Sequence, residues 1–176
     1  MASQFSTYSK IQAVIDIAKA VSVDSIGALQ KEVASQAPPN FLVRKYDRER
    51  DTFRPAISER AVRKAVRLCL LLGLIDEHGS LSKGGRDALR SSKFDDVVAA
   101  SVRAYLRSNG VEFAKLNTMI VEQLHRTPPN LTTSEALWNL SKPSLAYPVF
   151  ATLLSLLSQC GRADSSQSKI YLKFSH

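Results

Sequence analysis

The stretch from Ser58 to Leu89 constrains the fold of this chain more than any other part of the sequence. Ser58 is a favourable N-cap, since its hydroxyl can accept a hydrogen bond from a backbone N–H that the first helical turn leaves unpaired. Glu59 suits the positive end of the helix dipole. Gly73 offers a C-cap, because glycine readily adopts the left-handed backbone that ends many helices. The sequence therefore predicts a helix over 58–73.

This predicted helix has one basic face and one apolar face. At about 100° per residue, its four bases fall within an arc of roughly 100°, and small apolar residues fill the opposite side. After the last base the helix becomes apolar all round, which is typical of a buried C-terminal half. The basic face consists of Arg60, Arg63, Lys64 and Arg67, and the apolar face of Ala61, Val62, Ala65, Val66 and Cys69. We expect the basic face to lie in solvent.

A short hairpin and another helix are predicted directly after this helix. Leu74 and Ile75 precede a polar turn over 76–80 and then Leu81, a pattern typical of a strand, a tight turn and a return strand. The motifs "LGLI", "DEHG", "SLS" and "KGGRDAL" resemble the recognition helix, wing and following helix of winged helix-turn-helix proteins, whose members mostly bind DNA. The alternative is an amphipathic helix and hairpin of another α-rich domain, with the basic arc a solvated face.

Two helices are expected before this stretch, and a basic insertion between them and it. Residues 7–22 carry apolar side chains at helical spacing, and Asp24 is expected to cap a helix through Ser35. Residues 41–57 are too polar for a long helix and predict a short strand leading into a charged loop. Four side chains could anchor that loop: Phe41, Val43, Tyr46 and Phe53.

The positive charge of the chain is concentrated around this insertion. The 24 Lys and Arg residues outnumber the 16 Asp and Glu residues, which gives a net charge of +8. Nine bases and four acids lie between Arg44 and Arg67, so this segment alone carries +5. Such a balance favours polyanionic partners, either nucleic acid or an acidic protein surface. The bases of the insertion are Arg44, Lys45, Arg48, Arg50 and Arg54.

The second half of the sequence repeats the order of the first. Helices are expected over 95–108, 113–124 and 148–160, followed by a polar turn and an alternating strand. The form E-x5-PPN occurs at Glu32 and again at Glu122. The chain is therefore expected to be mainly α-helical with short β hairpins, as a tandem of winged-helix modules over 1–91, which includes the basic insertion 41–57, and 92–176.

The two predicted modules differ in their third helix. The helix over 148–160 has no base and more apolar positions than one buried stripe needs. We expect part of this surface to close against another protein or a second copy of the chain, as a homodimer. Basic residues return after it, with Lys169 in the predicted wing.

The sequence offers little support for an enzyme or a cofactor. The three histidines have no second ligand at metal-binding spacing, and no phosphate-binding glycine loop occurs. Cys69 and Cys160 lie in apolar helical patterns, which favours a reducing compartment. No signal peptide or membrane-spanning run is present. We expect a non-enzymatic protein without cofactor or metal, located inside the cell in the cytoplasm or nucleoid, or in a eukaryotic nucleus.

The leading hypothesis is a DNA-binding protein, such as a regulator, that places the helix over 58–73 in the major groove of duplex DNA. Arg60, Arg63 and Lys64 would face base edges, while the insertion, Lys83 and Arg86 would contact phosphates. The alternative is a structural adaptor, since tandem winged-helix subunits are known as kleisin-binding partners in chromosome-organising complexes. In that case the basic charge would be secondary.

Overall fold

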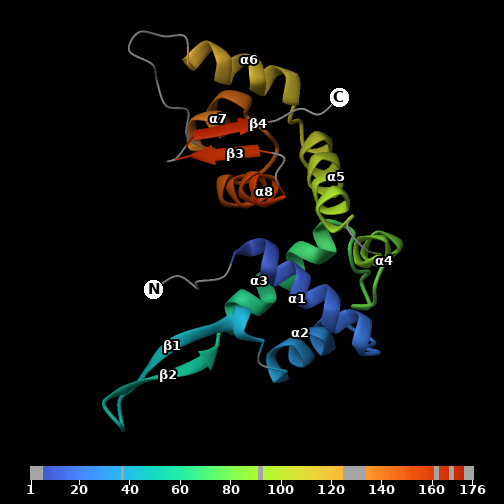
Figure 1. Ribbon diagram of the computed structural model, residues 1–176, viewed down its shortest axis with the longest axis vertical. Helices are drawn as coiled ribbons and strands as arrows, with labels where there is room; N and C mark the ends of the chain where they lie inside the picture. Colours follow the sequence, from blue (N-terminus) through green and yellow to red (C-terminus); the bar gives the residue numbers. More distant parts are fainter. Residues whose placement is uncertain are drawn as a thin grey trace. The chain divides into compact units, whose positions relative to one another are not determined.

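The computed structural model describes residues 6–36, 38–90, 93–124, 134–160, 163–166 and 169–172, and it is mainly helical (Figure 1). The chain divides into two compact units, Met1–Phe94 and Asp95–His176. Each unit has its own core. None of the helices in the described part of the chain is long and apolar enough to cross a bilayer.

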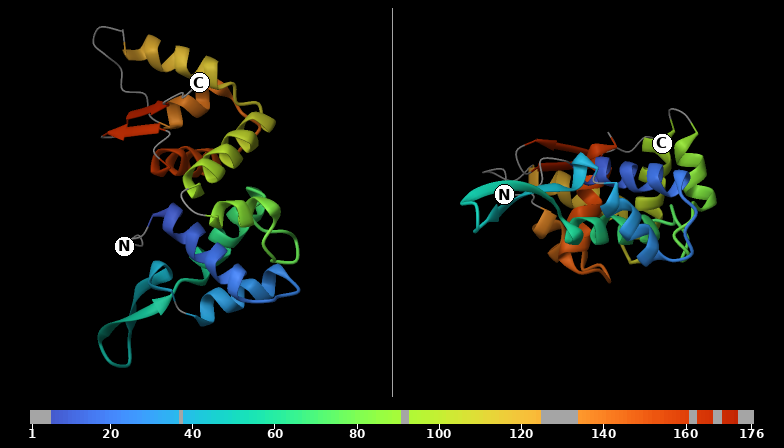
Figure 2. Two further views of the ribbon diagram at one scale, coloured as in Figure 1. Left: turned by 45° about the vertical axis from the view of Figure 1, so that its right-hand side comes forward. Right: turned by 90° about the horizontal axis from the view of Figure 1, so that it is seen from below.

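Four α-helices and a β-hairpin form the first unit. The helices are α1 Thr7–Ala20, α2 Ile26–Ser35, α3 Glu59–Leu71 and α4 Lys83–Leu89. A short 3-10 helix, Pro39–Phe41, leads into strands β1 Leu42–Asp47 and β2 Thr52–Ile57, which pair antiparallel. Figures 1 and 2 show this hairpin projecting away from the helices.

Serine caps begin all four helices of the first unit. The hydroxyls of Ser6, Ser25, Ser58 and Ser82 each accept a hydrogen bond from the backbone N–H three residues further on. Each such cap contributes on the order of 1 kcal/mol to helix stability. The cap predicted at Ser58 is confirmed, but the one predicted at Asp24 is wrong, because Ser25 takes that position.

The core of the first unit lies where α1 and α2 pack against α3. Side chains from all three helices and from the start of the hairpin are fully buried there, among them Ile11, Ile15, Leu29, Val33, Phe41, Val66 and Cys69. The apolar face predicted for α3 is therefore confirmed as the face toward the core. Gly73 follows with a positive φ of 66° and ends the helix, as its sequence position indicated.

The predicted wing of the first unit is much smaller than expected. Ile75 and Leu81 form one isolated antiparallel bridge, and no longer strand pairing extends from it within residues 38–90. The turn between them is held by Asp76, whose carboxylate accepts from the N–H groups of His78 and Ser80. A Cβ at Gly79 would lie 3.1 Å from the Ser25 carbonyl oxygen, so this turn packs back onto the start of α2.

Gly84 and Gly85 lie inside the first turn of α4. A Cβ at Gly85 would lie 2.0 Å from the Leu74 carbonyl oxygen, and one at Gly84 would lie 3.1 Å from that of Gly73. Glycine is therefore required at 85 for the helix to approach the backbone that leaves α3.

The second unit contains four helices and a second hairpin. The helices are α5 Phe94–Ser108, which begins at the last residue of the first unit, α6 Phe113–Leu124, α7 Ser134–Ser141 and α8 Tyr147–Gln159. Strands β3 Ala163–Ser166 and β4 Lys169–Leu172 pair antiparallel. The helix α8 packs against α7 and β3. Residues 125–133, which include the Pro-Pro-Asn of the second E-x5-PPN segment, lie outside the described residues.

The apolar surface expected on the helix over 148–160, which is α8, is buried. Phe150, Leu153, Leu154, Leu156 and Leu157 are each at most 1% exposed. The expectation that these positions remain free for a second copy of the chain is therefore wrong. A homodimer remains a prediction, but this helix no longer provides its basis.

Candidate nucleic-acid interface

The basic face of α3 is the centre of the candidate site. Arg60, Arg63, Lys64 and Arg67 are all exposed, whereas Val62, Val66 and Cys69 on the other side of the helix are buried. Within the described part of the chain, none of these four bases forms an ion pair with a carboxylate. The helix thus presents a row of cations that have no carboxylate partner among the described residues.

Two further lysines flank this row, one on each neighbouring helix. Lys10 of α1 lies near Lys64; burial lowers the pKa of Lys10, and the charge of Lys64 lowers it further. On the other flank, Lys31 of α2 and Arg63 of α3 line a cavity of about 360 Å³ together with Glu59. Neither lysine was predicted to belong to this surface, because only the packing of α1 and α2 against α3 brings them there.

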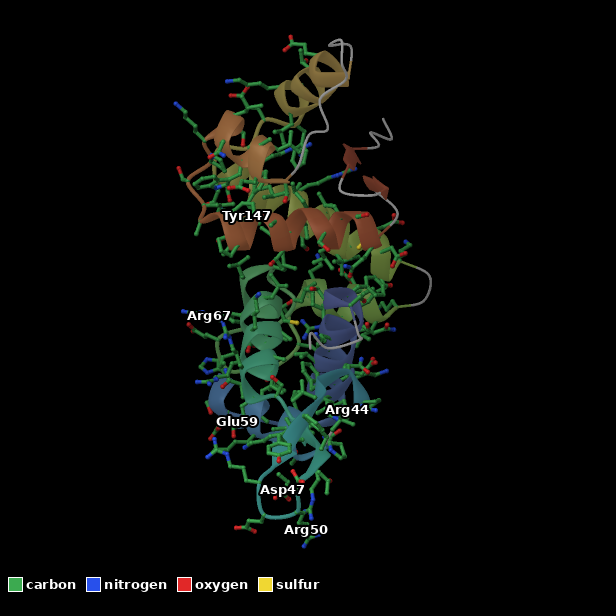
Figure 3. The ribbon with its side chains drawn as sticks, turned by 90° about the vertical axis from the view of Figure 1, so that its left-hand side faces the viewer. Arg44, Asp47, Arg50, Glu59, Arg67 and Tyr147 are labelled. Atoms are coloured by element: carbon green, nitrogen blue, oxygen red, sulfur yellow. The ribbon has the colours of Figure 1, made fainter. Side chains whose placement is uncertain are left out.

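The insertion before α3 is a β-hairpin. The predicted short strand is confirmed as β1, but the charged loop expected after it is a turn followed by a second strand, β2. Its strands pair from Leu42 with Ile57 to Asp47 with Thr52, and Arg48–Asp51 forms the turn. A hydrogen bond from the Ser58 N–H to the Phe41 carbonyl closes its base directly before α3. The hairpin bases are therefore attached to the N-terminal end of the basic face. Figure 3 shows Arg67, Glu59 and Arg50 in order from the body of the unit to the far end of the hairpin.

The two faces of this hairpin carry different side chains. Because neighbouring residues of a strand point to opposite faces and paired residues share one, the register sorts them. The aromatic face consists of Arg44, Tyr46, Phe53 and Pro55, and the charged face of Lys45, Asp47, Thr52 and Arg54. Phe41 anchors the hairpin as predicted, with no exposed surface, but Tyr46 is 47% and Phe53 65% exposed, so these two aromatics are not anchors.

Two of the three carboxylates in the hairpin are already engaged. Asp47 forms an ion pair with Arg54, with 3.0 Å between Oδ2 and Nε. Asp51 accepts a hydrogen bond from the Tyr46 hydroxyl, and this bond, with a smaller contribution from burial, raises the pKa of Tyr46. The bases without an ion pair in the described part of the hairpin are Arg44, Lys45, Arg48 and Arg50, all of them exposed. The hairpin therefore extends the positive surface of α3.

The structure does not bring the remaining predicted bases to this surface. Lys83 and Arg86 belong to α4, which packs against the backbone at Gly73 and Leu74, at the opposite end of α3 from the hairpin. Arg86 also donates a hydrogen bond of 2.7 Å from Nη1 to the Leu81 carbonyl. Lys169 begins β4 of the second unit, and its side chain lies outside the described part of the structure.

The other reactive groups point to no site of their own. The described residues include no group of three or more His, Cys, Asp or Glu side chains that could hold a metal ion. Cys69 and Cys160 are buried thiols. Burial raises the pKa of Cys160 to about 12, with a smaller contribution from Asp95, and burial also raises that of Cys69.

No protein-family model, curated protein or solved structure gives a significant match to this chain. The function therefore has to be argued from the geometry and charge of the surface formed by α3 and the hairpin.

Proposed function

We propose that the first unit binds duplex DNA through the basic face of α3 and the adjoining β1–β2 hairpin. The observation that carries this proposal is the row of four exposed bases on α3 without an ion pair in the described residues, continued by four more on the hairpin. Lysine and arginine placed together without counterions repel one another, and DNA phosphates would relieve that repulsion while releasing condensed cations.

The dimensions of α3 suit the major groove. A helix of 13 residues is about 20 Å long, and its diameter of about 10–12 Å matches the groove width of about 12 Å. Arg60, Arg63 and Lys64 lie in its N-terminal half and would face base edges, where arginine can bind guanine through two hydrogen bonds. Lys10 and Lys31 flank this helix and would contact the phosphates on either side of the groove.

We further propose that the first unit is a winged-helix variant. Three helices followed by an antiparallel bridge support this assignment. In this variant the long basic hairpin stands before the recognition helix, and the wing after it is reduced to one bridge. The adaptor hypothesis relied on unused apolar positions in α8, and because these are buried, we do not propose it.

The test is a titration of fluorescent duplex DNA, followed by anisotropy, with the full chain and a variant carrying Ala at Arg60, Arg63, Lys64 and Arg67. We expect affinity to fall by about a hundredfold or more, because each direct base or phosphate contact contributes on the order of 1–3 kcal/mol. The helix should remain folded, since these side chains are exposed and alanine favours helix.

The matched control removes four exposed bases elsewhere: Lys19, Arg90, Lys93 and Lys115. It changes the net charge of the chain by the same amount, so its affinity for duplex should stay within about fivefold of the wild type if position matters more than total charge. Equal losses in both variants would contradict the placement of DNA on α3.

A further inference from the structure

The exposed aromatic pair on the hairpin has no role in the binding mode described above. Tyr46 and Phe53 face each other across the strands, with ring centroids 5.3 Å apart and ring planes inclined by 59°. Phe53 keeps 65% of its surface in solvent. Large apolar side chains exposed together at the end of a projecting element commonly mark a contact surface. The pair is therefore a candidate for contact with a partner.

We infer that this aromatic face stacks on an unpaired nucleobase, so that the protein prefers DNA in which the duplex ends or opens next to the α3 site. The inference rests on the proposed function and adds the class of DNA. Phenylalanine has no hydrogen-bonding group, so it can offer a base only its ring. Stacking on such a ring is tolerant of sequence because every base has a flat π face.

The charges around the pair favour nucleic acid as the occupant. Arg44 lies on the same face of the hairpin, and Arg48 and Arg50 lie in the turn beside it. Asp47 is paired with Arg54, and Asp51 accepts a hydrogen bond from Tyr46. Among residues 42–57, Glu49 is the acid that neither Arg54 nor Tyr46 contacts in this way. A ligand for this face should thus combine a flat apolar group with negative charge, as a nucleotide does.

The inclination of the two rings limits how a base can bind. Rings inclined by 59° cannot both lie parallel to one base. The Tyr46 hydroxyl is tied to Asp51, which fixes that ring, so Phe53 is the ring that would lie on the base. Tyr46 would then support Phe53 from its side.

The length of the hairpin explains why this contact lies outside the groove occupied by α3. Six residues per strand at about 3.4 Å each extend about 20 Å from the base of the hairpin. That distance corresponds to about six base pairs of duplex at 3.4 Å per pair. A base inside an intact duplex is stacked on both sides and cannot meet Phe53 without the cost of unstacking, whereas an unpaired base avoids that cost.

The experiment compares a blunt duplex with the same duplex extended by a single-stranded tail whose first unpaired base is the fluorescent analogue 2-aminopurine. We expect the full chain to bind the tailed DNA about tenfold more tightly, within the range that aromatic–base stacking supplies, and to quench the 2-aminopurine fluorescence. Phe53→Leu keeps an apolar side chain but removes the ring, so it should lose both the preference and the quenching. Leu140→Ala, which removes an exposed apolar side chain of the second unit, should keep both.

Three outcomes would overturn the inference. If the wild type binds both DNAs equally and without quenching, the inference fails while the proposed function stands. If Phe53→Leu keeps the preference and the quenching, Phe53 is not the stacking ring. If the wild type binds neither DNA, the proposed function fails as well, and binding to vesicles of equal parts phosphatidylcholine and phosphatidylserine that depends on Phe53 would assign the hairpin to an anionic membrane surface.

Discussion

The helices α3 and α8 have the same length and are each followed by an antiparallel pairing, yet they present different surfaces. Each has 13 residues and buries at least five side chains. α3 begins with a serine cap and an acid and then carries four exposed bases, whereas α8 begins without a side-chain cap and has no charged residue at all. The length and burial of a helix therefore do not determine what its outer face can bind.

The same contrast holds for the whole units. Residues 1–94 contain sixteen Lys and Arg against ten Asp and Glu, while residues 95–176 contain eight against six. Nine of the bases of the first unit lie on α3 and the hairpin, so this charge forms a continuous surface. If DNA binds there alone, changes on α3 and the hairpin should alter affinity and its salt dependence, and changes in the second unit should not.

The largest effect should come from salt. With about six phosphates contacted, affinity for duplex should fall by about a thousandfold between about 50 and 200 mM salt, since each neutralised phosphate contributes about −0.9 to the slope of log K against log salt. A variant with Ala at the hairpin bases Arg44, Lys45, Arg48 and Arg50, which are expected to contact phosphates, should lose about 3–4 units of that slope, while the control without Lys19, Arg90, Lys93 and Lys115 keeps it. Anisotropy titrations at several salt concentrations measure both slopes, and a wild-type slope near zero would contradict a phosphate-binding role for the first unit.

A glycine substitution should separate the stability of the two units. Gly85→Ala places a methyl group 2.0 Å from the Leu74 carbonyl oxygen, so α4 has to shift, at a cost of about 3 kcal/mol in the free energy of unfolding. Gly27→Ala, with nothing within 4 Å of the new atom, should stabilise the first unit by up to about 1 kcal/mol instead. Calorimetry of the full chain should show the change in the transition of the first unit, and an equal shift of every transition would mean that the units unfold together.

The buried thiols Cys69 and Cys160 should make the stability of both units fall at alkaline pH. Burial raises the pKa of Cys160 to about 12 and also raises that of Cys69, whereas an unfolded thiol ionises near pH 8.5. As the pH rises, the thiols of the unfolded chain therefore lose their protons before those of the folded chain. The contribution of the buried thiols to the free energy of unfolding is complete below about pH 8.5 and is lost as the pH rises toward the folded pKa. In that window, each thiol should lower the free energy of unfolding by about 1.4 kcal/mol per pH unit.

Thermal melts between pH 8 and 10.5 test this by comparison with a Cys69→Ala, Cys160→Ala variant, whose stability should fall less steeply with pH. Identical pH dependence in the two proteins would mean that the thiols do not ionise on unfolding in this range.

The smallest effect should come from the outer face of α8. Replacing Thr152, Ser155 and Gln159 by Ala should change affinity for duplex by less than about twofold, because uncharged hydroxyls and an amide contribute little to phosphate binding. The same titration measures it. A loss approaching that of the α3 variant would show that the second unit also contacts DNA and would remove the contrast between the two helices.

The sequence predicted those elements whose signals are local. The cap at Ser58, the left-handed Gly73 and the apolar spacing of α3 all act within a few residues, and α6 lies where its pattern placed it. The exposure of the four α3 bases followed from helical spacing, since the apolar face had to be inside. These features carry the centre of the candidate site.

The pairing of two strands into a hairpin was not predicted, because the residues of β1 and β2 do not alternate between apolar and polar. Both faces of β1 and β2 carry charged side chains, so no period of two in hydrophobicity marks the strands. The turn also lacks glycine, and Asp51 adopts the positive φ of 48° in its place. The basic surface around Lys10 and Lys31 was missed for another reason: it depends on which helices pack side by side, which a single sequence does not encode locally.

The pairing of β1 and β2 has a consequence for how this chain could change over evolutionary time. The hairpin joins the unit at its base, where Phe41 is buried and the Ser58 N–H donates to the Phe41 carbonyl, so the length of the strands beyond this base can vary without disturbing the core. Deleting one residue from each strand would turn every side chain beyond the deletion to the other face of the hairpin, whereas deleting two from each strand would leave the remaining side chains on their own faces. Insertions and deletions in related chains should therefore occur in steps of two paired positions, each moving the tip by about 7 Å.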